Sequence, residues 1–115
     1  MRKKAYYLST CNTCKRILSE IDSSSMELQE IKGNPLTLEQ VEELRELAGS
    51  YEALLNRRAK KYQKRGLKEV ALSEEAIKAL LLEHYTFLKR PVFVIDNQIF
   101  IGNSKKVVTN LKEAI

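Results

Sequence analysis

The stretch from Ala5 to Ile21 reads AYYLSTCNTCKRILSEI, and the rest of the chain is best interpreted outward from it. Its first four residues are apolar or aromatic, which predicts a short buried strand. Apolar residues then recur with helical spacing, at Cys14, Ile17, Leu18 and Ile21. The sequence therefore predicts a strand that turns directly into a helix, with Cys11 and Cys14 at the turn.

This C-x-x-C motif is the strongest chemical signal in the chain. A helix N-terminus offers free N–H groups and partial positive charge, both of which favour a thiolate. Cys14 shares the apolar stripe and should be buried, whereas Cys11 precedes the stripe and should be exposed. We expect Cys11 to be the nucleophile and Cys14 to resolve its adduct by forming a redox-active disulfide. Asn12, Thr13 and Lys15 are expected to position the thiolate or the substrate.

Two other interpretations of the cysteines remain open at this point. Cys14 could simply be a core residue, with neither thiol reactive. The pair could also be half of a zinc site, but zinc takes four ligands and the only other soft candidate is His84. The position of His84 on the apolar edge of a predicted helix favours a structural role. We therefore predict no metal site.

Composition limits the protein to a few classes. The chain has 115 residues, of which 43% are hydrophobic and 30% charged, as expected for one globular domain. It contains no apolar run of the roughly 20 residues that a spanning helix needs. The N-terminus has no signal-peptide pattern, so we expect a cytoplasmic protein without a membrane partner. In a reducing compartment, two cysteines more often do chemistry than hold a fold together.

The positive charge is concentrated in one segment. The chain has a net charge of +5, and seven basic residues with no acidic residue lie between Arg57 and Lys68. A basic surface of this kind can attract a small oxyanion, an acidic protein or nucleic acid, or it can simply be a solvated helix face. Only Tyr62 is interleaved among the bases, and nucleic-acid surfaces usually add more aromatic side chains for stacking. We do not expect direct nucleic-acid binding.

The remaining pattern completes an α/β fold. A second strand is predicted from Met26 to Ile31. Helices are predicted after the capping box that begins at Thr37, from Tyr51 to Arg65 with a break near Asn56, after Ser73 and after Ser104. Strands at residues 92–95 and 98–101 form a hairpin through Asp96-Asn97. We expect one domain over residues 1–115, with a four-stranded mixed sheet flanked by helices and a helical insert at about 37–85.

Together these features resemble the arsenate-reductase/Spx family, whose fold is thioredoxin-like. The stretches that carry the resemblance are Tyr7 to Lys15, Asn34 to Thr37, Leu54 to Asn56, Tyr62 to Leu67, and Leu88 to Val94. The resemblance implies that Cys11 is the catalytic cysteine and that Arg90 stabilises its thiolate or oxyanion adduct. It also implies that Pro91 is a cis-proline facing the active-site loop. No bound cofactor is implied, and glutathione, glutaredoxin or thioredoxin would supply electrons.

Two departures from the family pattern bear on the substrate. Classical arsenate-reducing members resemble one another in using three arginines around one cysteine. Here only Arg90 is kept, while Asn56 and Asn103 stand at the other two positions. An asparagine supplies neither a charge nor a bidentate fork. Asn56 and Asn103, with the adjacent Arg57 and Arg58, are candidate anion-binding residues.

The second departure is Cys14, which classical members lack and Spx-type regulators have. Our leading hypothesis is therefore a thiol–disulfide oxidoreductase acting on a small oxyanion, such as arsenate, or on a thiol or disulfide substrate. The alternative is an Spx-type redox-sensing transcription regulator that binds RNA polymerase. A family member without catalytic activity is a third interpretation.

Overall fold

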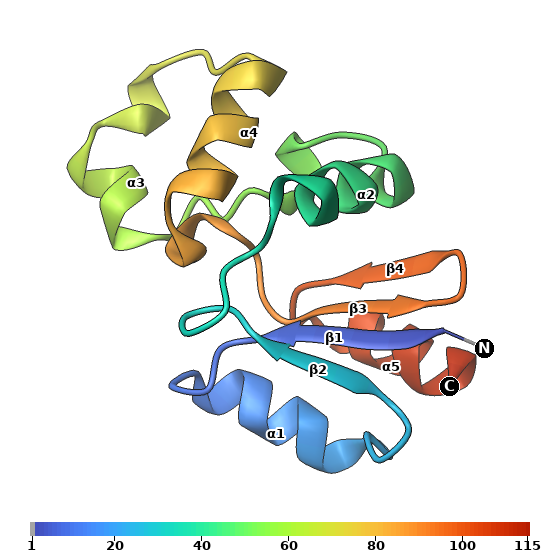
Figure 1. The fold of residues 1–115 in the computed structure, drawn as a ribbon. Helices are drawn as coiled ribbons and strands as arrows, with labels where there is room; N and C mark the ends of the chain where they lie inside the picture. Colours follow the sequence, from blue (N-terminus) through green and yellow to red (C-terminus); the bar gives the residue numbers. More distant parts are fainter. Residues whose placement is uncertain (1) are drawn as a thin grey trace. The chain divides into compact units, whose positions relative to one another are not determined.

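The computed structural model describes residues 2–115, which form two compact units (Figure 1). The first unit ends at Asn34 and resumes at Arg90, so it is built from both ends of the chain. The second unit runs from Pro35 to Lys89. Within residues 2–115, no helix combines the length and apolar character needed to cross a membrane.

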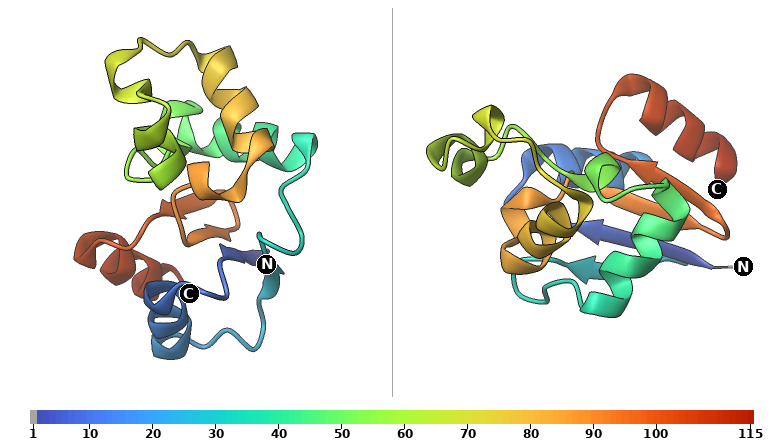
Figure 2. Two further views of the ribbon diagram at one scale, coloured as in Figure 1. Left: turned by 90° about the vertical axis from the view of Figure 1, so that its left-hand side faces the viewer. Right: turned by 90° about the horizontal axis from the view of Figure 1, so that it is seen from above.

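The first unit contains a four-stranded mixed sheet. Its strands are β1 (Lys3–Tyr7), β2 (Glu27–Glu30), β3 (Val92–Ile95) and β4 (Gln98–Ile101). They lie in the order β2-β1-β3-β4, which Figure 2 shows from two further directions. β1 is parallel to β2 and antiparallel to β3, and β3 and β4 form the expected hairpin. Its turn includes Asp96 with a φ of 52°, a conformation that Asp tolerates better than most residues.

Two helices cover one face of this sheet. They are α1 (Asn12–Glu20) and α5 (Lys105–Ala114), and their buried faces meet the strands in one apolar cluster. The fully or nearly fully buried members of that cluster are Ala5, Ile17, Met26, Phe93, Ile95 and Leu111. Ala5 and Phe93 are paired across β1 and β3, so they point to the same face. Ser104 caps α5 as predicted, by accepting the N–H of Val107 at 3.2 Å.

The second unit is helical. It contains α2 (Leu38–Ala48), α3 (Lys60–Lys64) and α4 (Glu74–Glu83), and the short 3₁₀ turns η1 (Glu52–Leu54), η2 (Leu67–Glu69) and η3 (Tyr85–Phe87). The capping box at the start of α2 is present in full. The Thr37 hydroxyl accepts the N–H of Gln40, and the Gln40 side chain accepts the N–H of Thr37. Ser73 caps α4 in the same way.

The predicted helical stretch from Tyr51 to Arg65 does break near Asn56, but the non-helical part is wider than expected and runs from Leu55 to Ala59. Only η1 and the five-residue α3 are helical there. Between them, Leu55 forms an isolated antiparallel bridge with Leu88, and the N–H of Asn56 bonds to the carbonyl of Phe87 at 2.7 Å. These contacts with a distant segment replace the local helical hydrogen bonds.

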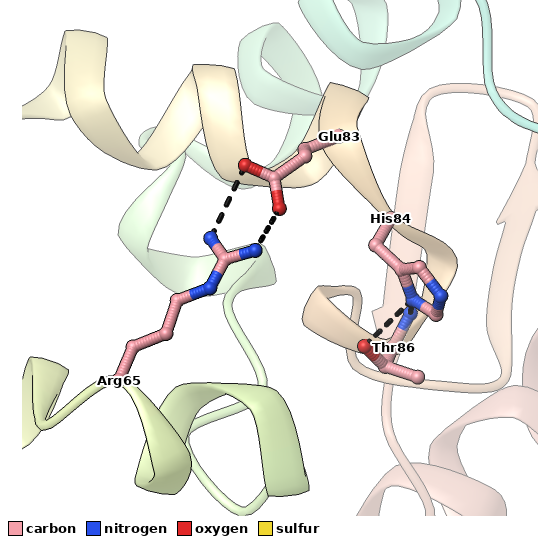
Figure 3. A network of polar contacts seen from close by, with 4 residues as sticks. All are labelled: Arg65, Glu83, His84 and Thr86. Carbon is pink, nitrogen blue, oxygen red and sulfur yellow. Dashed lines mark hydrogen bonds and ion pairs between the residues drawn. The ribbon is translucent and has the colours of Figure 1, made fainter.

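Side-chain contacts connect the last part of this unit (Figure 3). The Arg65 guanidinium makes a two-point ion pair with Glu83 at the end of α4. His84 follows α4, and its Nδ1 accepts the backbone N–H of Thr86 at 3.1 Å and lies 2.9 Å from the Thr86 hydroxyl. His84 thus acts as an N-terminal cap for η3, which is a structural role.

Candidate functional site

The cysteine loop connects β1 to α1. β1 ends at Tyr7, and the carbonyl of Leu8 accepts the N–H of Cys11 at 3.1 Å, which closes a tight turn. Cys11 has an extended backbone and stands at the N-cap position, where its carbonyl accepts the N–H of Lys15 at 3.1 Å. The sequence folds this way because the apolar stripe of the helix begins only at Cys14. Cys11 is consequently half-exposed at the N-terminus of α1.

The surroundings of Cys11 favour its thiolate. Partial burial disfavours the charged form, but hydrogen bonds to the sulfur outweigh that effect. The donors are the backbone N–H of Cys14, the thiol of Cys14 and the backbone N–H of Thr13, and Arg90 adds positive charge. The resulting pKa of Cys11 lies below that of an ordinary thiol. Cys11 can therefore act as a nucleophile at a pH where most thiols are protonated.

Cys14 has the opposite character. Burial is the main reason that its pKa is raised to about 11, since its side chain is inaccessible to solvent. A hydrogen bond from the backbone of Leu8 works against this rise, as does the charge of Arg90. Two effects of Cys11 raise the pKa of Cys14 further: the Cys14 thiol donates a hydrogen bond to the Cys11 sulfur, and the negative charge of Cys11 repels a second thiolate. The two sulfurs are in hydrogen-bond contact, yet only one of them ionises readily.

Arg90 brings an unsatisfied cation to this pair. Its Nε and Nη1 atoms are both buried and have no hydrogen-bond partner. Buried donors are normally paired, so an arginine left in this state is suited to receive an anion. The next bond, Arg90–Pro91, is cis, and the buried Pro91 immediately precedes β3. Its carbonyl accepts the N–H of Gly102 at 2.9 Å, which links it to the loop after β4.

The other candidate residues of the first unit lie around the ends of the helices. Asn12 and Lys15 are exposed in the first turn of α1, and Thr13 is half-buried there with its N–H directed at Cys11. Asn103 is exposed in the loop between β4 and α5. Of these four, Thr13 is the one whose backbone bonds directly to the Cys11 sulfur.

Asn56, Arg57 and Arg58 belong to the second unit, where local contacts occupy two of their side chains. The Asn56 amide donates to the Thr86 carbonyl at 3.3 Å and accepts the N–H of Arg58 at 3.0 Å. The Arg57 guanidinium lies 3.5 Å from the Glu52 carboxylate. These contacts give Asn56 a clear structural role in the turn before α3, which sequence inspection did not reveal.

Sequence reasoning missed Glu30, the last residue of β2. Its Oε2 accepts the backbone N–H of Ser9 in the cysteine loop at 2.9 Å. Its Oε1 accepts the N–H groups of Lys32 at 3.0 Å and Gly33 at 2.7 Å. The bond from Ser9 is the largest of the effects that hold the pKa of Glu30 below its usual range, so this side chain is a carboxylate at neutral pH. A glutamate at a strand end carries no signal of such a role until the register of β2 on β1 is known.

Among residues 2–115, no three His, Cys, Asp or Glu side chains gather as a metal-binding group. The groups that the structure places at the cysteine loop are two thiols with oppositely shifted pKa values and the Arg90 guanidinium.

Comparison with known structures identifies similar folds. An arsenate reductase from Vibrio cholerae is 18% identical, with a TM-score of 0.81, over 100% of this chain and 98% of that chain. A protein from Staphylococcus aureus is 25% identical, with a TM-score of 0.76, over 94% and 96% of the two chains. An arsenate reductase related protein from Brucella melitensis is 23% identical, with a TM-score of 0.69, over 92% and 90%. The predicted thioredoxin-like α/β fold is confirmed.

Sequence comparison gives the family. No curated protein sequence matches the chain. The model of the ArsC family, however, matches residues 6–111, a range that includes the cysteine loop, Arg90 and all four strands except the start of β1. The resemblance stated from the motifs is thereby confirmed, and the chain belongs to the ArsC family.

Proposed function

We propose that this protein is a thiol–disulfide oxidoreductase in which Cys11 attacks an oxidised substrate and Cys14 resolves the adduct. The observation that supports this proposal is that two sulfurs in hydrogen-bond contact have pKa values shifted in opposite directions. The pKa of Cys11 is lowered by hydrogen bonds and Arg90, while burial raises that of Cys14 to about 11. Such asymmetry makes one sulfur attack first and keeps the other as a protonated reserve.

With a disulfide substrate, the reaction takes two exchanges. The Cys11 thiolate bonds to one substrate sulfur and expels the other as a thiolate, leaving a mixed disulfide. Cys11 is then no longer negative, which removes the repulsion that opposes ionisation of Cys14. Cys14 loses its proton to the departing thiolate or to water and attacks the Cys11 sulfur. The Cys11–Cys14 disulfide forms, the second substrate thiolate leaves, and two electrons have passed to the substrate.

Arg90 supports an anionic substrate. Its buried Nε and Nη1 atoms have no partner, and they belong to the residue whose charge acts on both thiols. With arsenate, the Cys11 sulfur would bond to arsenic as hydroxide leaves. Attack by Cys14 on that sulfur would then release arsenite and leave the disulfide. A thiol donor such as glutathione, glutaredoxin or thioredoxin would return the two electrons.

The test is to expose the reduced protein to glutathione disulfide and, separately, to arsenate. A mass loss of about 2 Da, assigned to a Cys11–Cys14 bond, is expected with a competent substrate. With glutathione disulfide, Cys14→Ser should stop at a mixed disulfide on Cys11. Cys11→Ser should react with neither oxidant. An unchanged mass with both oxidants would refute the oxidoreductase proposal, and equal reaction of Cys11→Ser would refute the role of Cys11.

The basic segment favours a second candidate function, that of a redox-sensing regulator. Lys60, Lys61, Lys64 and Lys68 are all exposed, which gives the second unit a positive surface suited to an acidic protein. A regulator of the Spx type would bind RNA polymerase through a surface that changes with the cysteine redox state. Capture of purified RNA polymerase that depends on oxidation, without substrate turnover, would favour the regulator; turnover without capture would favour the enzyme.

A further inference from the structure

Glu30 joins the end of β2 to the cysteine loop. It pairs in register with Tyr7, the last residue of β1, so its side chain lies where the loop begins. Three backbone N–H groups bond to its carboxylate, one from Ser9 and two from the turn after β2. The Ser9 hydroxyl also bonds to it. One carboxylate therefore ties two neighbouring loops together.

The loop residue that Glu30 holds is adjacent to the contacts of both thiols. Ser9 follows Leu8, whose carbonyl accepts the N–H of Cys11 and whose backbone bonds to the sulfur of Cys14. Ser9 itself is exposed and lies outside both β1 and α1, so no strand or helix fixes its backbone. Two bonds restrain this part of the turn: the Leu8–Cys11 backbone bond that closes it, and the bond from the Ser9 N–H to Glu30.

We propose that Glu30 is a positioning residue that keeps Cys11 at the N-terminus of α1 by fixing the backbone of Ser9. Glu30 acts through the loop and does not touch the substrate. This inference rests on the proposed function, because it takes Cys11 to be the reacting thiol.

The proposal predicts that loss of Glu30 raises the pKa of Cys11, whereas a simple charge effect predicts that it lowers this pKa. The direction of the shift therefore tests the proposal. A carboxylate near a thiol disfavours the thiolate, so removing its charge should ease ionisation of Cys11. Loss of the bond to Ser9 should instead loosen the turn and weaken the N–H bonds to the Cys11 sulfur.

The experiment compares Glu30→Gln and Glu30→Asp with the matched control Glu27→Gln. Glutamine replaces one acceptor oxygen by a donor, and aspartate keeps the charge but shortens the reach. Glu27 lies on the same strand, but its carboxylate contacts Lys4 at 3.5 Å. The measurement is the pH profile of Cys11 alkylation by iodoacetamide on folded protein, with peptide mapping, followed by the Cys11–Cys14 reduction potential against glutathione.

Both Glu30 variants should alkylate about three- to tenfold more slowly than the original protein at pH 7, because the thiolate fraction falls. The reduction potential of the Cys11–Cys14 pair should drop in both variants, by about 30 mV for each tenfold fall in the equilibrium constant for reduction of the disulfide. Glu27→Gln should match the original protein. A Cys11 midpoint that is unchanged or lower in folded Glu30→Asp and Glu30→Gln would overturn the proposal. Failure of the proposed function would show separately, as an original protein whose Cys11 and Cys14 do not form a disulfide.

Discussion

Replacing Cys14 with alanine should make Cys11 a weaker nucleophile at neutral pH. This effect is separate from the loss of the Cys11–Cys14 disulfide. The substitution removes the thiol donor to the Cys11 sulfur and leaves the backbone N–H of Cys14 in place. A hydrogen bond to a charged group contributes about 1.5–3 kcal/mol, and a thiol is a weak donor, so we take about 1 kcal/mol. That corresponds to a rise of about 0.7 in the pKa of Cys11 and to a loss of thiolate at pH 7 of at most about fivefold.

The assay is the rate of iodoacetamide alkylation at Cys11 between pH 5 and 10, with Cys14→Ser as the matched control. Serine keeps a donor at this position, so its midpoint should stay near that of the original protein. Neither variant can form the internal disulfide, which separates the effect on ionisation from the effect on resolution. A midpoint for Cys14→Ala equal to or below that of Cys14→Ser would refute the inference that the Cys14 thiol stabilises the Cys11 thiolate.

Three further predictions concern other parts of the chain. Arg90→Met should slow Cys11 alkylation at pH 7, because it removes a positive charge that stabilises the thiolate. The free energy of unfolding in urea should stay unchanged or rise by about 1 kcal/mol, because two unpaired buried donors are removed. A loss of stability above about 1 kcal/mol would contradict this prediction. Thr37→Ala should lower the unfolding free energy by about 1 kcal/mol, with Thr37→Ser close to the original protein in the same urea titration. Burial and the charges of Lys61 and Arg65 lower the pKa of His84 in the folded protein. The imidazole therefore binds a proton more readily in the unfolded chain, and the free energy of unfolding should fall as pH drops below about 6.5. His84→Asn, which keeps an acceptor for the Thr86 N–H, should lose less stability between pH 7 and 5; an equal loss would exclude His84 as the cause.

Features that depend on nearby residues could be predicted from the sequence. The capping box needs only Thr37 and Gln40 at their spacing, and the hairpin needs only two apolar runs around Asp96-Asn97. The difference in burial between Cys11 and Cys14 follows from where the apolar stripe of α1 begins. Each of these signals lies within a few residues of the feature that it predicts.

Features that depend on distant residues could not be predicted. A break near Asn56 could be predicted, but its cause could not, because Asn56 bonds to Thr86 and Phe87, about thirty positions along the chain. The role of Glu30 requires the register of β2 on β1, because a shift by one residue would turn its carboxylate to the other face. The unpaired nitrogens of Arg90 likewise depend on what surrounds them in three dimensions.

The position of β1 between β2 and β3 has a consequence for synthesis on the ribosome. β2 emerges soon after β1, but β3 is translated only after the whole segment from Pro35 to Lys89. At typical elongation rates this leaves one edge of β1 without its antiparallel neighbour for on the order of several seconds. Until translation reaches Ile95, a nascent chain therefore exposes an unpaired strand edge that carries Ala5 and Tyr6, the kind of edge that favours pairing with another chain.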